Sequence, residues 1–91
     1  MASVRYNGNK NVVGTRLKVL REKRNLTQGE LAAKMQIMGF VLDQQAISII
    51  ENNKRVVTDF EIAGFCQALH CTEKDLLLEF YEVLNGCRAN T

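Results

Sequence analysis

The sequence predicts a single all-α domain, and three observations support this prediction. The chain has 91 residues, which is enough for one small domain but not for two. It contains no proline, and its apolar residues recur at spacings of three and four, which is the periodicity of amphipathic helices. With 46% hydrophobic and 24% charged residues, the composition is that of a soluble globular protein, so a buried core is expected.

Four helix starts carry clear local signals. Thr27 and Thr58 each stand three residues before a glutamate, which is the spacing of a capping box. Asp43 and Thr72 can cap a helix without the full box. At each start, an apolar or thiol residue precedes the cap and another lies four residues into the helix, which predicts a hydrophobic staple. The four pairs are Leu26 with Leu31, Leu42 with Ile47, Val57 with Ile62, and Cys71 with Leu76.

Residues that tolerate a left-handed backbone follow the first three helices. Asn25 is expected to end the first helix, Gly39 the second and Asn53 the third. Five helices are therefore predicted, at about 12–24, 28–38, 44–52, 59–70 and 73–85. They form one compact domain over residues 12–85, between a flexible N-terminal tail over residues 1–11 and a C-terminal tail over residues 86–91.

Several classes of protein are not indicated. No apolar stretch approaches the roughly 18 to 20 residues of a membrane span, and residues 1–11 lack the apolar segment of a secretory signal. The chain is therefore expected in the cytoplasm. His70 is the only histidine, and no nucleophile or carboxylate pair shows catalytic spacing, so no enzyme is predicted. We expect His70 to be a capping or dipole residue at a helix end.

The three cysteines are Cys66, Cys71 and Cys87. Thiols stay reduced in the cytosol, and we interpret these three as small apolar side chains. A metal site of His70, Cys66 and Cys71 is rejected because a helical spacing of five turns Cys71 away from Cys66, and no fourth ligand is evident. No metal and no cofactor are predicted.

Charge is distributed unevenly along the chain. Up to Arg55, ten cationic residues face four acidic ones, a net charge of +6, whereas the remainder carries −4. A basic half on a nearly neutral protein is typical of a one-sided phosphate-binding surface. A solvated helix face is the alternative interpretation, and the charge pattern alone leaves both open.

Two stretches resemble the Cro/repressor-type (XRE-like) helix-turn-helix family of transcriptional regulators. Residues 17–32 read LKVLREKRNLTQGELA, and residues 46–55 read AISIIENNKR. The resemblance extends from about Val13 to Leu77 and implies a lambda-repressor-like domain. The chain departs from the family in two places: the segment 36–42 is several residues longer than the usual turn, and Asn53 replaces a customary glycine. The longer turn leaves the angle between the two motif helices open.

The resemblance also implies roles for particular residues. The helix 44–52 would lie in the major groove, where Gln44, Gln45, Ser48 and Ile49 would contact bases. A glutamine amide suits adenine, while Ile49 would either touch a thymine methyl or pack on the long turn. Residues that would contact phosphate are Gln28, Asn52, Lys54 and Arg55. Arg21 and Glu51 would form a structural ion pair, and the core of the motif would be Leu31, Ala32, Met35, Ile47 and Ile50.

Other cations have weaker assignments. Arg16, Lys18, Lys23 and Lys34 could neutralise further phosphates, but exposed helical cations are more often bystanders. The tail with Arg5 and Lys10 could enter a minor groove, although disorder is the preferred interpretation.

The predicted function is that of a DNA-binding transcriptional regulator, a repressor, whose partner is a double-stranded DNA operator. One such domain reads half a site, and the helix 73–85 carries more apolar residues than one face can bury, so a homodimer through this helix is expected. The alternatives are an antitoxin that covers a toxin with this helix, and a protein-interaction adaptor that keeps the fold without reading DNA.

Overall fold

Residues 8–89 are described in the computed structural model, with the side chains of residues 8–86. Within this range the chain forms helices and no β-strand. The helices are α1 (Gly14–Lys23), α2 (Gln28–Ile37), α3 (Gln44–Glu51), α4 (Asp59–Leu69), α5 (Glu73–Leu76) and α6 (Leu78–Ala89). The predicted all-α class is confirmed.

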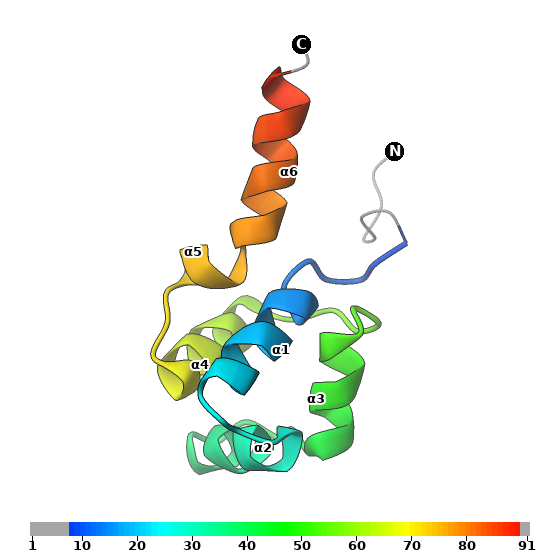
Figure 1. Cartoon of the computed structure of the whole chain (residues 1–91). Helices are drawn as coiled ribbons and strands as arrows, with labels where there is room; N and C mark the ends of the chain where they lie inside the picture. The colour runs from blue at the N-terminus through cyan, green and yellow to red at the C-terminus, as the bar shows by residue number, and fades with distance from the viewer. Residues whose placement is uncertain (1–7, 90–91) are drawn as a thin grey trace.

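Helices α1 to α4 pack around one core, and α6 projects from this globule (Figure 1). The motif residues predicted to be structural are all buried in that core. The complete buried apolar set is Val13, Leu17, Leu20, Leu31, Ala32, Met35, Leu42, Ile47, Ile50, Phe65, Cys66, Ala68, Leu69 and Leu76. No helix among the described residues has the length and apolar character needed to cross a membrane.

The helix starts form as the local signals predict. Thr27 and Thr58 each make a complete capping box, and the carboxylate of Asp43 accepts a hydrogen bond from the Ala46 amide at 2.8 Å. Thr72 also makes a complete box, with Asp75 as the reciprocal acceptor. Our prediction missed this box because it considered only glutamate at the third helical position.

The three residues predicted to end helices adopt positive φ angles. Asn25 has φ 58°, Asn53 has φ 61° and Gly39 has φ 97°. His70, at the end of α4, has φ 53°, so it is the residue at which that helix terminates and the chain reverses.

The last predicted helix is two helices, so the five-helix prediction is wrong. α5 ends at Leu76, which is fully buried, and α6 begins at Leu78 on a new axis (Figure 1). The change of direction lets Leu76 stay in the core while α6 leaves it. α6 also continues to Ala89, so residues 86–89 of the predicted tail are helical.

The chain before α1 is attached to the turn after α3. Lys10 donates its backbone N–H to the Asn53 carbonyl at 2.9 Å, and the Asn11 amide donates to the carbonyls of Ile50 and Arg55 at 3.1 and 2.8 Å. These bonds hold residues assigned to the flexible tail, and α1 begins at Gly14 rather than near residue 12. Residues 1–7, with Arg5, and residues 90–91 lie outside the described residues.

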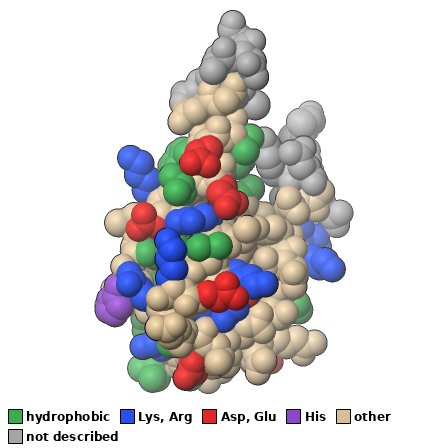
Figure 2. Space-filling view, in the orientation of Figure 1, with side chains coloured by type: hydrophobic (Ala, Val, Ile, Leu, Met, Phe, Trp, Pro, Cys, Tyr) green, Lys and Arg blue, Asp and Glu red, His purple; other side chains and the backbone are tan. Residues whose placement is uncertain are grey.

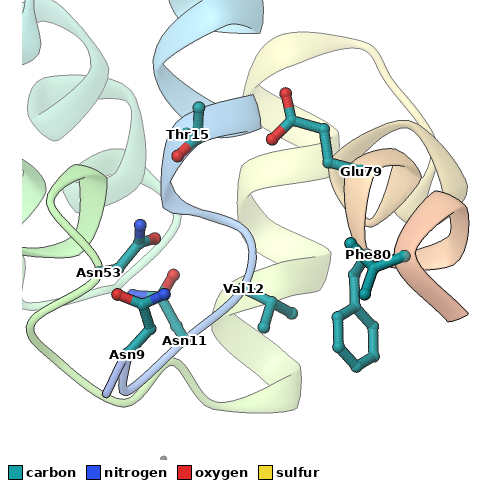
Figure 3. A pocket seen from close by; sticks show the side chains of 8 residues that line it. Asn9, Asn11, Val12, Thr15, Asn53, Glu79 and Phe80 are labelled. Carbon is teal, nitrogen blue, oxygen red and sulfur yellow. The ribbon is translucent and has the colours of Figure 1, made fainter. Parts of the chain in front are cut away.

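A shallow hollow lies where α6 meets this segment. Val12 and Thr15 border it on one side, and Phe80 and Val83 of α6 border it on the other (Figure 3). Its volume is about 230 Å³. The base of α6 therefore faces the start of α1 across this hollow, and most of the helix extends beyond the globule (Figure 1).

The long turn between α2 and α3 folds against α4. The ring of Phe40 lies over Gly64, where no side chain separates it from the helix, and stacks on Phe60 with 6.4 Å between ring centroids. The Gln36 amide donates to the Leu42 carbonyl at 2.8 Å and closes the turn. Phe40 therefore packs on α4 while Val41 is almost fully exposed, and the long turn does not cover the first turn of α3, where Gln44 and Gln45 are exposed.

Candidate nucleic-acid interface

α3 presents one polar face to solvent and one apolar face to the core. Ile47 and Ile50 are fully buried, whereas Gln44 and Gln45 in its first turn are exposed. Ser48 is half-buried, and Ile49 is 39% exposed. The four residues predicted to contact bases therefore lie outside the core.

The first turn of α3 lies beside the start of α2. The Oε1 atom of Gln44 is 3.6 Å from the position that a Cβ atom on Gly29 would occupy. Gly29 is the second residue of α2, so the Gln44 side chain lies beside the free amides of this helix N-terminus. Such an N-terminus favours anions.

A buried ion pair connects α1 to the end of α3. The Arg21 Nε atom lies 2.6 Å from Glu51 Oε2, and Arg21 Nη2 lies 3.2 Å from Oε1. Arg21 Nη1 also donates to the Leu26 carbonyl at 2.6 Å. Hydrogen bonding to Glu51 is the largest cause of the raised pKa of Arg21. Neither side chain is available to a base, because both are almost fully covered.

Gln28 joins this pair. Its Nε2 atom donates to Glu51 Oε1 at 3.0 Å, a contact that sequence reasoning missed. A glutamine amide has two N–H donors, so one remains for a phosphate. The contact fixes the first residue of α2 against the last residue of α3.

Arg55 is held by Glu61 at the start of α4. The two guanidinium nitrogens lie 3.0 and 2.9 Å from the two carboxylate oxygens, and Nη1 also donates to the Val56 carbonyl. Hydrogen bonding by Arg55 is the largest cause of the lowered pKa of Glu61, which the backbone and side chain of Thr58 lower further. The sequence signal for this contact was Glu61 itself, which we considered only as a capping residue.

The remaining predicted phosphate contacts are exposed. Asn52 lies just after α3, and its Nδ2 atom donates to the Ser48 carbonyl at 2.9 Å. Lys54 follows in the turn and is exposed. Gln28 is half-buried at the start of α2, so the predicted phosphate contacts come from α2 and from the turn that follows α3.

Two arginines of the basic half cap other helices. Arg24 donates to the carbonyls of Leu69 and His70 at 2.8 and 3.1 Å, and Arg16 donates to the Asp75 carbonyl at 3.1 Å. Figure 2 shows Lys and Arg side chains interspersed with acidic ones on the face it presents. Lys18, Lys23 and Lys34 are exposed. Two cations of the basic half, Arg16 and Arg24, therefore hold other helices in place.

The fold and this surface define a class of protein. A short helix with an exposed polar first turn, held beside the N-terminus of a second helix, is the arrangement of helix-turn-helix DNA-binding domains. A family model described as a helix-turn-helix domain matches residues 12–79. The chain belongs to this family, in agreement with the resemblance to Cro/repressor-type regulators. Neither curated proteins nor solved structures yielded a match to the chain.

Proposed function

We propose that the protein is a cytoplasmic, sequence-specific DNA-binding repressor that reads the major groove with α3. The observation that supports this most directly is the exposure of Gln44 and Gln45 in the first turn of a helix whose opposite face is buried. In helix-turn-helix proteins, the N-terminal residues of the recognition helix contact base edges.

The chemistry of the exposed face fits base recognition. A glutamine amide can pair in bidentate fashion with N6 and N7 of adenine, and each good pair contributes roughly 1 to 3 kcal/mol of discrimination. The Ser48 hydroxyl can donate or accept one turn later. The exposed Ile49 side chain supports the thymine-methyl alternative over packing on the long turn.

Phosphate contacts would surround this face. The second N–H of Gln28 and the N-terminal amides of α2 would bind one phosphate, and Asn52 and Lys54 would bind others after α3. Arg55 has already committed three of its five donors to Glu61 and Val56. Its remaining two donors would serve a phosphate while the pair with Glu61 stays intact.

Selection of bound duplexes from a random pool tests this proposal. The Q44A and Q45A variants are compared with the parent chain, and Q67A is the matched control because Gln67 is an exposed glutamine of α4. Q44A and Q45A should each relax the selected sequence at different positions and weaken binding by about 1 to 3 kcal/mol. Unchanged preferred sites and affinity in both variants would refute the assignment of α3.

We further propose that the repressor is a homodimer joined through α6. Leu78, Tyr81 and Leu84 are each at least 38% exposed on this projecting helix, and covering them with a second copy would remove apolar surface from water. Two copies would place two α3 helices on half-sites about 34 to 36 Å apart, one turn of the duplex. Sedimentation of the free protein tests this directly.

The same exposed helix favours two alternative functions, an antitoxin and a protein-interaction adaptor. An antitoxin would use α6 to cover a toxin, and an adaptor would use it to bind another protein without reading DNA. Steep weakening of DNA binding with salt indicates true phosphate contacts, so a chain without salt-dependent DNA affinity would be an adaptor. Isolation of a stoichiometric complex with the product of a neighbouring gene would identify an antitoxin.

A further inference from the structure

The end of α4 brings two cysteines together. The chain reverses at His70, which has a left-handed backbone, and the Cys71 N–H donates to the Cys66 carbonyl at 3.0 Å. This six-residue closure is the bond of a Schellman motif, which brings the residues at its two ends close together. Both of these residues are cysteines here.

Each thiol lies close enough to the other to affect its pKa. We separated these two cysteines by extending helical spacing through residue 71, and this was wrong because the chain reverses at His70 before it reaches Cys71. The 3.0 Å backbone bond keeps the two Cα atoms within about 7 Å of each other, close to the range of roughly 4.4 to 6.8 Å that a disulfide spans.

The surroundings keep both thiols protonated. Cys66 is buried, and burial is the largest cause that raises its pKa to about 12. Cys71 is half-buried, and burial also raises its pKa. The charged groups that act on Cys71 are Glu73 and Asp75 of α5 and Arg24 beyond the end of α1. Because thiolates are the reactive form, the raised pKa values slow the reaction of both thiols with any oxidant, a disulfide included.

We infer that Cys66 and Cys71 form a redox modification site, which takes a small disulfide such as oxidised glutathione and becomes an intramolecular disulfide. The half-buried Cys71 loses its proton to solvent and attacks one sulfur of oxidised glutathione, which releases one glutathione thiolate. Cys66 then loses its proton and attacks the Cys71 sulfur of the mixed disulfide, which releases the second. Two thiols are oxidised, and one disulfide is reduced to two thiols.

The position of the bond determines its structural effect. Cys71 directly precedes Thr72, the N-cap of α5, and packs against the core that holds Leu76. Arg24 caps the carbonyls of Leu69 and His70 at the same corner. A disulfide would therefore close the junction from which α5 and α6 extend, without requiring any residue of α3 to move.

Equilibration in glutathione redox buffers tests the site. The C87A variant removes the third thiol of the chain, and its double variant C71S/C87A lacks the pair. In C87A, oxidised glutathione should remove both titratable thiols and lower the intact mass by two hydrogen atoms, and dithiothreitol should reverse the change. The C71S/C87A chain should gain no internal disulfide.

The same redox equilibrium, measured in urea, distinguishes a disulfide favoured by the folded structure from one favoured only by the short separation of the two cysteines in sequence. The effective concentration of the pair should be at least about tenfold higher in the folded C87A chain than in urea, with the helical circular dichroism preserved. Three results would overturn the inference: equal or lower effective concentration in the folded chain, only glutathione adducts, or loss of helix on oxidation.

Discussion

The guanidinium of Arg55 and the carboxylate of Glu61 are joined by two parallel hydrogen bonds of 3.0 and 2.9 Å. Glu61 also accepts a bond from the Thr58 amide at 3.0 Å and so closes the capping box of α4. One carboxylate thus connects the turn after α3 to α4.

This pair predicts a stability that depends on acid pH. The pKa of Glu61 is held below its ordinary value of 4.5, chiefly by Arg55. A carboxyl whose pKa is lowered on folding stabilises the protein above its unfolded value, and this contribution disappears as pH falls through the folded value. The urea midpoint should therefore fall as pH drops below about 4.5, and R55Q should show a smaller fall.

An equal acid dependence in the parent chain and R55Q would show that the pair does not couple to folding. K18Q is the matched control because Lys18 is an exposed cation of α1. It removes the same charge without removing a partner of Glu61, and its acid dependence should match that of the parent.

Removal of Glu51 should be more damaging than removal of Gln28. E51A leaves Arg21 buried without its partner, and breaking a buried pair typically costs about 3 to 5 kcal/mol. Q28A removes one hydrogen bond from the same carboxylate and should cost about 1 kcal/mol. Chemical denaturation measures both, and similar losses in the two variants would contradict a buried role for the ion pair.

Two glycines should respond to alanine in opposite directions. A Cβ atom on Gly14 would collide with the Ile50 carbonyl oxygen and with Oδ1 of Asn53, whereas one on Gly86 of α6 meets nothing within 4 Å. G14A should therefore lower the free energy of unfolding by about 1 to 3 kcal/mol. G86A should leave it unchanged or raise it by up to about 1 kcal/mol, through helix propensity.

Thermal and urea denaturation of the two variants would check this contrast. If G14A were as stable as the parent chain, the close approach of α1 to the end of α3 would not be the geometry in solution.

The salt dependence of DNA binding should distinguish two cations. Lys54 is exposed in the turn after α3, so K54A should reduce the slope of log K against log salt by about 1. Arg16 donates to the Asp75 carbonyl, and R16A should leave that slope unchanged. The opposite pattern would indicate that DNA binds near α1 and α5 and not at α3.

A charge on α6 should separate the proposed dimer. Leu84 is 38% exposed on this helix, and L84E would place a carboxylate inside the interface between two copies, where an unpaired charge is unfavourable. The variant should sediment as a monomer with parent-like circular dichroism. E82Q is the control, because it removes a charge from the same helix and leaves the exposed apolar residues Leu78, Tyr81 and Leu84 unchanged. A parent chain that is monomeric at high concentration would remove the basis of this prediction.

The sequence by itself determined the starts of α2 to α5, because their signals act within four or five residues. Thr27, Asp43 and Thr58 accept from amides three residues away, and the left-handed Asn25 and Asn53 need only their own backbone preference. The exposure of Gln45 follows equally locally, since it lies almost opposite the buried Ile47 and Ile50 on α3.

Only the tertiary structure decided which partners these elements acquire. The break at Leu77 depends on the core into which Leu76 fits, and Gln28 finds Glu51 only because α2 packs against α3. Cys66 and Cys71 meet because the chain reverses at His70, where an unbroken helix would have separated them. Local propensity acts within one turn of helix, whereas these contacts depend on how the chain folds back on itself.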